Sequence, residues 1–289
     1  MIKNSISKPM HKGLELHYEI INDDTINIKL PPRCGPQGFF CCCSIKLNLI
    51  TEYINFYKKI PKNIISNRQF ILYKSRSEME NNEDITSQYF EINEDVVINY
   101  IEPFIFSHDD QFSNFKNLNF NLLNPIIKKY FTPNKSINNL VNIIETKYNI
   151  EYENTCAIFY RGNDKMTEMN LPSYKDFADH ADLIKFIDNN IKFLIQSDET
   201  EFIQTFMERY SGKSFFFKDE IRHINRQINT VDLIQQNTNN YYSKLFLSIM
   251  IIMSKCKYVI CNSGNCSMWI SLFRGNADNI IQEMNGKWV

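Results

Sequence analysis

The residues of this sequence best suited to chemistry follow a short apolar run near the middle of the chain. Residues 156–160 are apolar or aromatic throughout and too few for a helix, which predicts a buried parallel strand. Arg161, Asp164 and Lys165 come directly after it. In open α/β sheets, ligands bind in the crevice beyond the carboxyl ends of the strands, and a permanently charged guanidinium suits phosphate oxygens. This stretch therefore predicts a site for a phosphate-bearing ligand.

Two more expected strands end in polar residues. Residues 197–199 follow the expected strand 192–196, and residues 262–265 follow the expected strand 257–261. Because the carboxyl ends of parallel strands meet at one edge of a sheet, these loops and Arg161 are expected to converge. A Ser-Gly turn at a helix N-terminus presents N–H groups that suit phosphate. The candidate side chains in the two loops are Ser197, Asp198, Glu199, Ser263, Gly264 and Asn265.

Each of these signals also has a purely structural interpretation. Residues 197–199 could form a helix N-cap with an acidic first turn, and residues 263–265 could be an ordinary turn. Arg161 could be a salt-bridge partner of Asp164. The recurrence of polar residues at three successive strand ends favours the functional interpretation.

Strands and helices are expected to alternate through the second half of the chain. Such alternation predicts a parallel sheet covered by helices on both faces. The expected strands are 156–160, 192–196, 214–217 and 257–261, and the expected helices are 173–190, 199–210, 241–254 and 266–273.

The first half is expected to open with a βαβ unit. Its expected elements are a strand at 25–30 ended by Pro31-Pro32, a turn at 34–38, a helix at 44–60 and a strand at 70–73. Two α/β domains are therefore predicted, residues 1–150 and residues 151–289, facing each other across a cleft.

The composition limits the classes of partner. With 289 residues, of which 43% are hydrophobic, the chain can bury one large core or two ordinary ones. The net charge of -1 argues against nucleic-acid binding, because there is no basic excess to neutralise a phosphate backbone. No stretch approaches the roughly 18 apolar residues of a membrane span, and the first residues lack an apolar leader. We therefore expect no membrane span and a cytoplasmic location.

Neither metal nor another cofactor is expected. The eight cysteines include Cys41, Cys42 and Cys43, but no Cys-x-x-Cys pairing or histidine spacing suggests zinc, so they are interpreted as reduced structural residues. Asp176, Asp179, His180 and Asp182 resemble a metal cluster, yet acidic residues are also favoured near a helix start. The sequence has no Asp-x-Asp and no glycine-rich phosphate fingerprint.

The three strand-end motifs resemble those of a known family. Arg161-Gly-Asn-Asp164-Lys165 resembles the His-x-Arg-x-x-Asp-Lys motif of the fucosyltransferase superfamily, which contains the α-1,6-fucosyltransferases and protein O-fucosyltransferases. Residues 197–199 are similar to its Thr-Asp-Asp, and residues 263–265 to its Ser-Ser-Gln phosphate loop. The likeness covers residues 156–273 and is greatest for the α-1,6 branch, where Lys165, Glu168 and Tyr174 also have counterparts.

This resemblance implies a GT-B fold, with two Rossmann-like, doubly wound parallel-sheet domains. The C-terminal domain would hold GDP-fucose, and the N-terminal one would serve the acceptor, a hydroxyl on a glycan or protein. The transfer would be inverting and metal-independent. Arg161 would neutralise the leaving phosphate, Glu168 would be the general base, and Lys165 would belong to the catalytic set. The implied nucleotide-sugar contacts are Arg161, Asp164, Tyr174, Ser197, Asp198, Glu199, Ser263, Gly264 and Asn265.

Two positions depart from the family pattern. Phe159 stands where the motif has histidine, and Ser248 stands where the helix before the last strand has aspartate. These departures leave two alternatives open. The donor could be another GDP-sugar, or the chain could be a catalytically silent protein that binds a nucleotide or glycan on the same fold.

Overall fold

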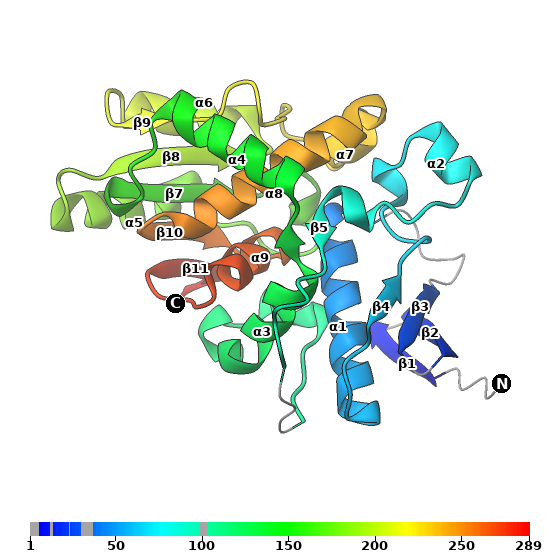
Figure 1. The fold of residues 1–289 in the computed structure, drawn as a ribbon. Helices are drawn as coiled ribbons and strands as arrows, with labels where there is room; N and C mark the ends of the chain where they lie inside the picture. Colours follow the sequence, from blue (N-terminus) through cyan, green and yellow to red (C-terminus); the bar gives the residue numbers. More distant parts are fainter. Residues whose placement is uncertain (1–5, 12–13, 23, 30–36, 99–102) are drawn as a thin grey trace. The chain divides into compact units, whose positions relative to one another are not determined.

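The computed structural model describes residues 6–11, 14–22, 24–29, 37–98 and 103–289, and the chain divides into two compact units (Figure 1). Unit 1 comprises residues 1–110 and 119–136, and unit 2 comprises residues 111–118 and 137–289. Helix α4 (Lys135–Tyr148), expected in the first domain, thus lies almost entirely in unit 2.

Unit 2 is built on a six-stranded mixed sheet. Its order is β12-β11-β10-β7-β8-β9, and every pairing is parallel except that of β12. Counted from β7, the parallel strands run in the order 3-2-1-4-5, which is the order of doubly wound nucleotide-binding sheets. The strands are β7 (Thr155–Tyr160), β8 (Lys192–Ser197), β9 (Ser214–Phe215), β10 (Tyr258–Asn262), β11 (Ile280–Met284) and β12 (Lys287–Trp288).

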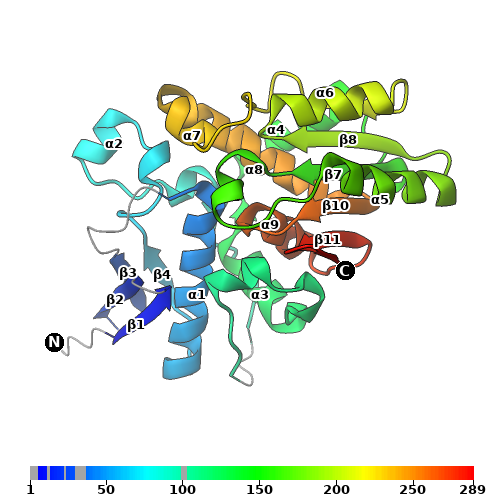
Figure 2. The same cartoon turned by 180° about the vertical axis from the view of Figure 1, so that it is seen from behind.

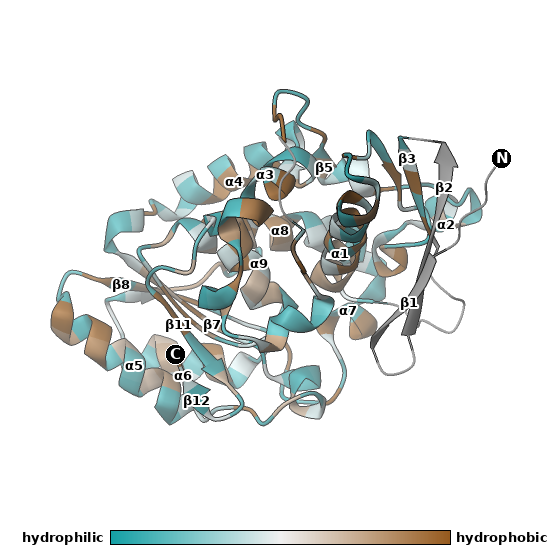
Figure 3. Ribbon diagram, turned by 90° about the horizontal axis from the view of Figure 1, so that it is seen from below, coloured by the Kyte–Doolittle hydropathy of each residue, from teal (hydrophilic) through white to brown (hydrophobic). Residues whose placement is uncertain are grey.

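Helices cover both faces of this sheet. Helices α5 (Tyr174–Ile187) and α6 (Thr200–Arg209) contribute to one buried cluster with alternate residues of β7 and β8, as the two-residue period of a strand requires. Helices α4 and α8 (Asn239–Lys255) lie over the other face, and α9 (Asn265–Arg274) packs beside α8 (Figures 1 and 2). Figure 3 shows the brown, hydrophobic colouring along β7 and β8.

The core of unit 2 is aromatic. The ring of Tyr160 stacks on that of Phe202 at 4.5 Å and meets Phe177 edge-on at 5.4 Å. Helix α5 begins with a capping box, in which Ser173 and Asp176 satisfy each other's backbone N–H groups. The four strands expected here are confirmed within a few residues, as are the four helices. Strands β11 and β12 had not been expected.

Unit 1 contains a four-stranded sheet of order β1-β2-β3-β4. Two of its three pairings are antiparallel, so the described residues do not form the doubly wound parallel sheet expected for the first half. The reason lies before the first expected strand, where two further strands pair as hairpins. The bounds are β1 (Ile6–His11), β2 (Leu14–Asn22), β3 (Thr25–Lys29) and β4 (Asn63–Ile65).

The βαβ opening is confirmed with a different second strand. Helix α1 (Phe39–Tyr57) connects β3 to β4, and these two strands pair in parallel. The expected strand 70–73 is wrong, because Phe70 has a left-handed backbone (φ 58°) and Ile71–Tyr73 form a 3-10 turn. Pro31, Pro32 and Cys34 lie outside the described residues. The remaining elements of unit 1 are α2 (Arg76–Glu80), β5 (Phe90–Glu91), α3 (Phe120–Tyr130) and β6 (Thr132–Pro133).

Helix α1 is buried along most of its length, and its N-cap residue, Gly38, has no side chain that could accept from the N-terminal N–H groups. Instead, the hydroxyl of Tyr73 accepts a hydrogen bond from the Phe39 N–H at 2.7 Å. Neither α1 nor any other helix in the described part of the chain has the length and apolarity that a membrane crossing requires.

Two isoleucines of α5 test this packing. Ile184 is 3% exposed and belongs to the buried cluster, whereas Ile187 is 66% exposed on the same helix. We expect Ile184→Ala to lower the free energy of unfolding by about 2–5 kcal/mol, because it leaves a cavity. We expect Ile187→Ala to change it by no more than about 0.5 kcal/mol. Urea denaturation followed by tryptophan fluorescence checks this, since both tryptophans, Trp269 and Trp288, lie in unit 2. Equal losses in the two variants would contradict the packing of α5.

Candidate functional site

The loops after β7 and β10 meet at the point where the strand order of unit 2 reverses. Such a switch point is where open α/β sheets bind ligands. The two loops are joined by a pair of hydrogen bonds. The Arg161 N–H donates to Asn262 Oδ1 at 2.9 Å, and Asn262 Nδ2 donates to the Arg161 carbonyl at 2.8 Å. The backbone at Arg161 is therefore fixed from both sides.

The Arg161 side chain is held by three neighbours. Its Nε donates to Asp198 at 2.9 Å, its Nη2 to Asp164 at 2.9 Å, and its Nη1 to the Cys266 sulfur at 3.0 Å. Burial acts to lower the pKa of Arg161, but Cys266 and the two carboxylates outweigh it and raise the pKa, so the guanidinium stays charged. The side chain is still 21% exposed and lines a hollow. It is a positioned cation with an accessible edge.

Two carboxylates at the end of β8 hold the loop after β7. Asp198 accepts the Gly162 N–H at 2.9 Å in addition to Arg161, and burial raises its pKa. Glu199 is fully buried and accepts the Asn163 N–H at 3.1 Å and the Arg226 Nε at 2.9 Å. The side chains of Asp198 and Glu199 are therefore used to shape the loop that carries Arg161.

Tyr174 and Ser197 support Glu199. The Tyr174 hydroxyl donates to the Glu199 carboxylate at 2.6 Å, and the Ser197 hydroxyl accepts the Glu199 N–H at 3.0 Å. Ser197 also lines the hollow beside Arg161. Of the two, Ser197 is the one in a position to meet a ligand there.

A second cationic group lies at the N-terminus of α9. The Lys165 ammonium is nearly buried and lies so close to Gly264 that a Cβ there would be 3.1 Å from Nζ. Gly264 has φ 152°, a conformation that L side chains rarely adopt. Lys165 donates to Glu168 at 2.5 Å, and the Glu168 side chain is 43% exposed. The Lys165 ammonium thus lies beside the N-terminus of α9. A cation next to a helix N-terminus is a favourable combination for binding an anion.

Three donors converge on one neutral oxygen at this place. The backbone N–H and side-chain Nδ2 of Asn265 donate to Gln111 Oε1 at 3.1 and 3.0 Å, and Lys165 Nζ lies 3.4 Å from the same atom. Gln111 is buried and comes from residues 111–118, the separate segment of unit 2. Its amide oxygen occupies a nest of donors that would suit an oxygen of an anion.

Ser263 is hydrogen-bonded to β11, away from Lys165, which Gly264 and Asn265 adjoin. Its N–H and its hydroxyl both donate to the Glu283 carbonyl, at 3.0 and 2.7 Å, and its hydroxyl also accepts from Gln282 Nε2 at 2.9 Å. Ser263 therefore joins β10 to β11 in this structure. Of the predicted Ser-Gly-Asn loop, Gly264 and Asn265 adjoin Lys165.

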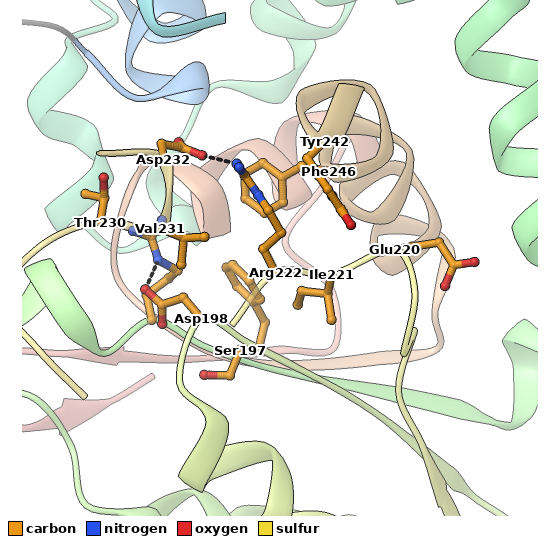
Figure 4. A pocket seen from close by; sticks show the side chains of 12 residues that line it. Ser197, Asp198, Glu220, Ile221, Arg222, Thr230, Val231, Asp232, Tyr242 and Phe246 are labelled. Atoms are coloured by element: carbon orange, nitrogen blue, oxygen red, sulfur yellow. Dashed lines mark hydrogen bonds and ion pairs between the residues drawn. The ribbon is translucent and has the colours of Figure 1, made fainter. Parts of the chain in front are cut away.

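The hollow beside Arg161 has aromatic and charged walls and about 550 Å³ of space, part of which is open solvent. Figure 4 shows Arg222 crossing it toward Asp232, with Tyr242 and Phe246 beside it and the Glu220 carboxylate directed away. Arg222 pairs with Asp232 at 2.5 Å, and its guanidinium lies 5.0 Å from the centre of the Tyr242 ring. The lining residues are Phe159, Arg161, Ser197, Asp198, Glu220, Ile221, Arg222, Thr230, Val231, Asp232, Tyr242 and Phe246.

An unsatisfied amide lies on the same face of the sheet. Gln196 is fully buried on β8, and in the described part of the chain neither its Oε1 nor its Nε2 has a hydrogen-bond partner. Its register partner on β7 is Phe159, whose ring lines the hollow, and paired residues of neighbouring strands point to one face. Buried polar groups without partners are rare in folded proteins, which suggests that a water or ligand completes this one.

The acidic group near the start of α5 has other uses than metal binding. Asp179 pairs with Lys175 at 2.5 Å, Asp182 pairs with Arg209 at 2.6 Å, and the His180 ring lies 4.2 Å from that of Trp288. Among the residues that the structure describes, no three or more His, Cys, Asp or Glu side chains form a group that could hold a metal ion.

The sequence did not identify several residues that complete this site. Gln111 is 154 positions from Asn265, and Cys266 is 105 positions from Arg161. The wall formed by residues 220–246 follows no expected strand directly. Only Asn262 had a local signal, because it immediately precedes the Ser-Gly-Asn loop.

Similarity to known proteins adds nothing to this geometry. No protein-family model matches the chain, and no curated protein matches its sequence. The resemblance to the fucosyltransferase superfamily thus depends on the three strand-end motifs. Any functional conclusion depends on them and on the arrangement of the site.

Gly162 is the position where the site tolerates no side chain. A Cβ there would lie 1.8 Å from Glu199 Oε1 and 2.1 Å from its carboxyl carbon. We expect Gly162→Ala to displace the buried carboxylate and to lower the stability of unit 2 by about 1–3 kcal/mol. Gly38→Ala is the matched control, since nothing lies within 4 Å of a Cβ at Gly38 in unit 1. Urea unfolding followed by tryptophan fluorescence would show the loss only for Gly162→Ala; an unchanged midpoint there would contradict the packing of Glu199.

Proposed function

We propose that this chain is a glycosyltransferase of GT-B type that transfers a sugar, most simply fucose from GDP-fucose, to a hydroxyl acceptor. The observation that carries the proposal is the state of Arg161. It is charged, anchored at the switch point of a doubly wound sheet, and accessible along one edge in a hollow lined by aromatic residues. These are the properties needed to meet the diphosphate of a nucleotide sugar.

The phosphate groups have two places with suitable donors. Arg161 offers N–H groups in a planar fork, which matches phosphate oxygens. Lys165 and the Asn265 N–H form the second place, now filled by the neutral oxygen of Gln111. A phosphate oxygen carries negative charge and would bind these donors more strongly than an amide oxygen does. In this proposal, Gln111 gives up the nest when the donor substrate binds.

The base of the nucleotide is assigned to the hollow. Phe159, Tyr242 and Phe246 provide faces for stacking, and the Asp232 carboxylate provides an acceptor. Guanine presents its 2-amino group as a donor, which an acidic side chain accepts well. Asp232 would then take the role of the aspartate that the family has at the position of Ser248. Ser248 itself cannot take it, since its hydroxyl donates to the Lys244 carbonyl at 2.9 Å within α8.

The chemistry follows from the charges at the phosphate. The acceptor hydroxyl oxygen attacks the anomeric carbon, and the bond from that carbon to the phosphate oxygen breaks with inversion. Arg161 stabilises the negative charge that develops on the leaving nucleoside diphosphate. Glu168, partly exposed beside Lys165, takes the proton of the acceptor hydroxyl.

A catalytically silent nucleotide-binding protein is the second candidate. It is favoured by the ion pairs of Arg161 with Asp164 and Asp198, which reduce the charge available to a phosphate. The two candidates differ in one measurement, the slow release of free sugar from GDP-fucose by purified protein. Binding of GDP without such hydrolysis, and without transfer to any glycan or protein acceptor tried, would favour the silent candidate.

GDP is expected to stabilise the protein in the presence of a chelator, and by more than UDP or ADP. A ligand at 100 times its dissociation constant adds about 2.7 kcal/mol to the free energy of unfolding. Thermal-shift measurements with the three nucleotides check this. A larger response to UDP with manganese than to GDP with chelator would contradict the assigned donor class.

Arg161→Lys and Arg209→Lys form a matched pair for the same assay. Lysine keeps the charge at Arg161 but loses the planar fork, so we expect GDP affinity to fall at least about tenfold. Arg209 makes an exposed ion pair with Asp182 and lies over the Tyr210 ring, and it does not line the hollow, so its variant should bind GDP as the unmodified protein does. Isothermal titration at a temperature where all three proteins are folded separates binding from stability. Equal affinities in the three would assign Arg161 a purely structural role.

Gln111→Ala tests the nest at α9. It removes the oxygen that three donors share, so the free protein should lose about 1–3 kcal/mol of stability. If phosphate uses the same donors, the stabilisation by GDP should become larger than in the unmodified protein. Gln204→Ala, on the exposed face of α6, is the control. A destabilised variant with an unchanged GDP response would show that these donors serve only to hold Gln111.

A further inference from the structure

A cysteine and a histidine of unit 1 lie within hydrogen-bond distance of each other. The Cys41 sulfur is 3.1 Å from Nε2 of His108, although the two residues are 67 positions apart in the sequence. Cys41 is partly exposed and lies in the first turn of α1, a helix of 19 residues. His108 is nearly buried in a 3-10 turn. A nucleophile and a base are thus paired outside the site of unit 2.

The surroundings of the pair favour a charged form. The other ring nitrogen of His108, Nδ1, lies 3.8 Å from Asp109 Oδ1, so a carboxylate is available to a protonated imidazole. The N-terminus of a long helix stabilises a negative sulfur. A thiol beside a base, with a carboxylate within ion-pair range of that base, has the neighbours of an activated thiol.

Cys41 differs from the other cysteines that the structure describes. Cys42, Cys43, Cys156, Cys256, Cys261 and Cys266 are all buried. Burial raises the pKa of Cys42, Cys256 and Cys261 to about 12, which suppresses their thiolate forms. Exposure and thiolate character together decide which cysteine reacts. Among the cysteines that the structure describes, Cys41 is the partly exposed one.

We propose that Cys41 is a site of covalent modification, at which a thiolate paired with the His108 imidazolium reacts with small soft electrophiles and small disulfides. The thiol proton passes to His108 Nε2. The sulfur then attacks one sulfur of a disulfide, a mixed disulfide forms, and the bond within the disulfide breaks. The departing thiolate takes up the proton from His108. The inference is independent of the glycosyltransferase proposal.

Further titratable groups lie on the two elements that carry the pair. Asp109 and Asp110 lie in the same 3-10 turn as His108, and Cys42, Cys43 and Lys46 follow Cys41 on α1. Burial raises the pKa of Asp110 and lowers that of Lys46, so both changes reduce charge near the pair.

The first experiment measures the reaction of the reduced full-length chain with iodoacetamide at pH 6.5 and 8.5, with the modified cysteine identified by peptide mass spectrometry. An ordinary thiol with a pKa of about 8.5 reacts roughly 50-fold more slowly at the lower pH, because its thiolate fraction falls by that factor. We expect a decrease of less than about fivefold at Cys41. Glutathione disulfide should add one glutathionyl group to the same residue. A 50-fold decrease, or no labelling of Cys41 in the folded chain, overturns the proposal.

Variants separate the pair from the helix N-terminus. His108→Gln should slow labelling of Cys41 at pH 6.5 by at least about tenfold, and Cys41→Ser should abolish the fast-reacting label. His180→Gln, a histidine of unit 2 whose ring packs against Trp288, is the matched control and should leave the rate unchanged. A folded His108→Gln variant with the original rate would show that the histidine has no part in the reactivity. If that variant does not fold, the pH profile of the unmodified chain still decides the question.

Discussion

The ion pair between Arg161 and Asp198 is the interaction on which the site of unit 2 depends. A charge that is four-fifths buried is tolerated only when it is paired, and removing one partner of such a pair costs about 3–5 kcal/mol. Asp198 also accepts the N–H of Gly162, so the same carboxylate fixes the side chain and the backbone of the loop after β7. Asn262 and Cys266 fix that loop from the side of β10 and α9.

If the site binds an anion, as proposed, this anchoring limits how it can do so. The carboxylates that keep Arg161 in place also reduce the attraction it offers, so a ligand must gain from other contacts as well. The hollow supplies aromatic faces, and the nest at α9 supplies donors that Gln111 occupies in the free chain. A site of this kind, with preorganised cations and modest net charge, would bind free phosphate weakly. It would select a ligand that contacts Arg161, the hollow and the nest at α9 at once.

Both chemical sites are assembled from residues that are distant in the sequence. Gln111 reaches the loop of Asn265 because Gln282 of β11 bonds to the backbone of Ser113 and Phe115, which holds residues 111–118 in unit 2. Cys41 meets His108 through the fold of unit 1 in the same way. Spacing rules for metal or nucleophile motifs are local, so the sequence offered no sign of either contact, and Cys41 had been interpreted as a structural cysteine.

The sequence by itself determined the elements of unit 2 that have a clear hydrophobic period, and it placed charged residues at their ends. The apolar residues 156–160 and 193–195 became the centres of β7 and β8, because a strand buried on both faces requires consecutive apolar residues. Tertiary structure alone decided which of these side chains face the hollow and which are buried as anchors. Ser263 turned toward β11, an unexpected strand, and Glu199 became a buried anchor, since in each case a buried hydrogen-bond partner outweighed exposure. The same competition replaced the expected strand 70–73 by a turn, with β4 beside β3 instead.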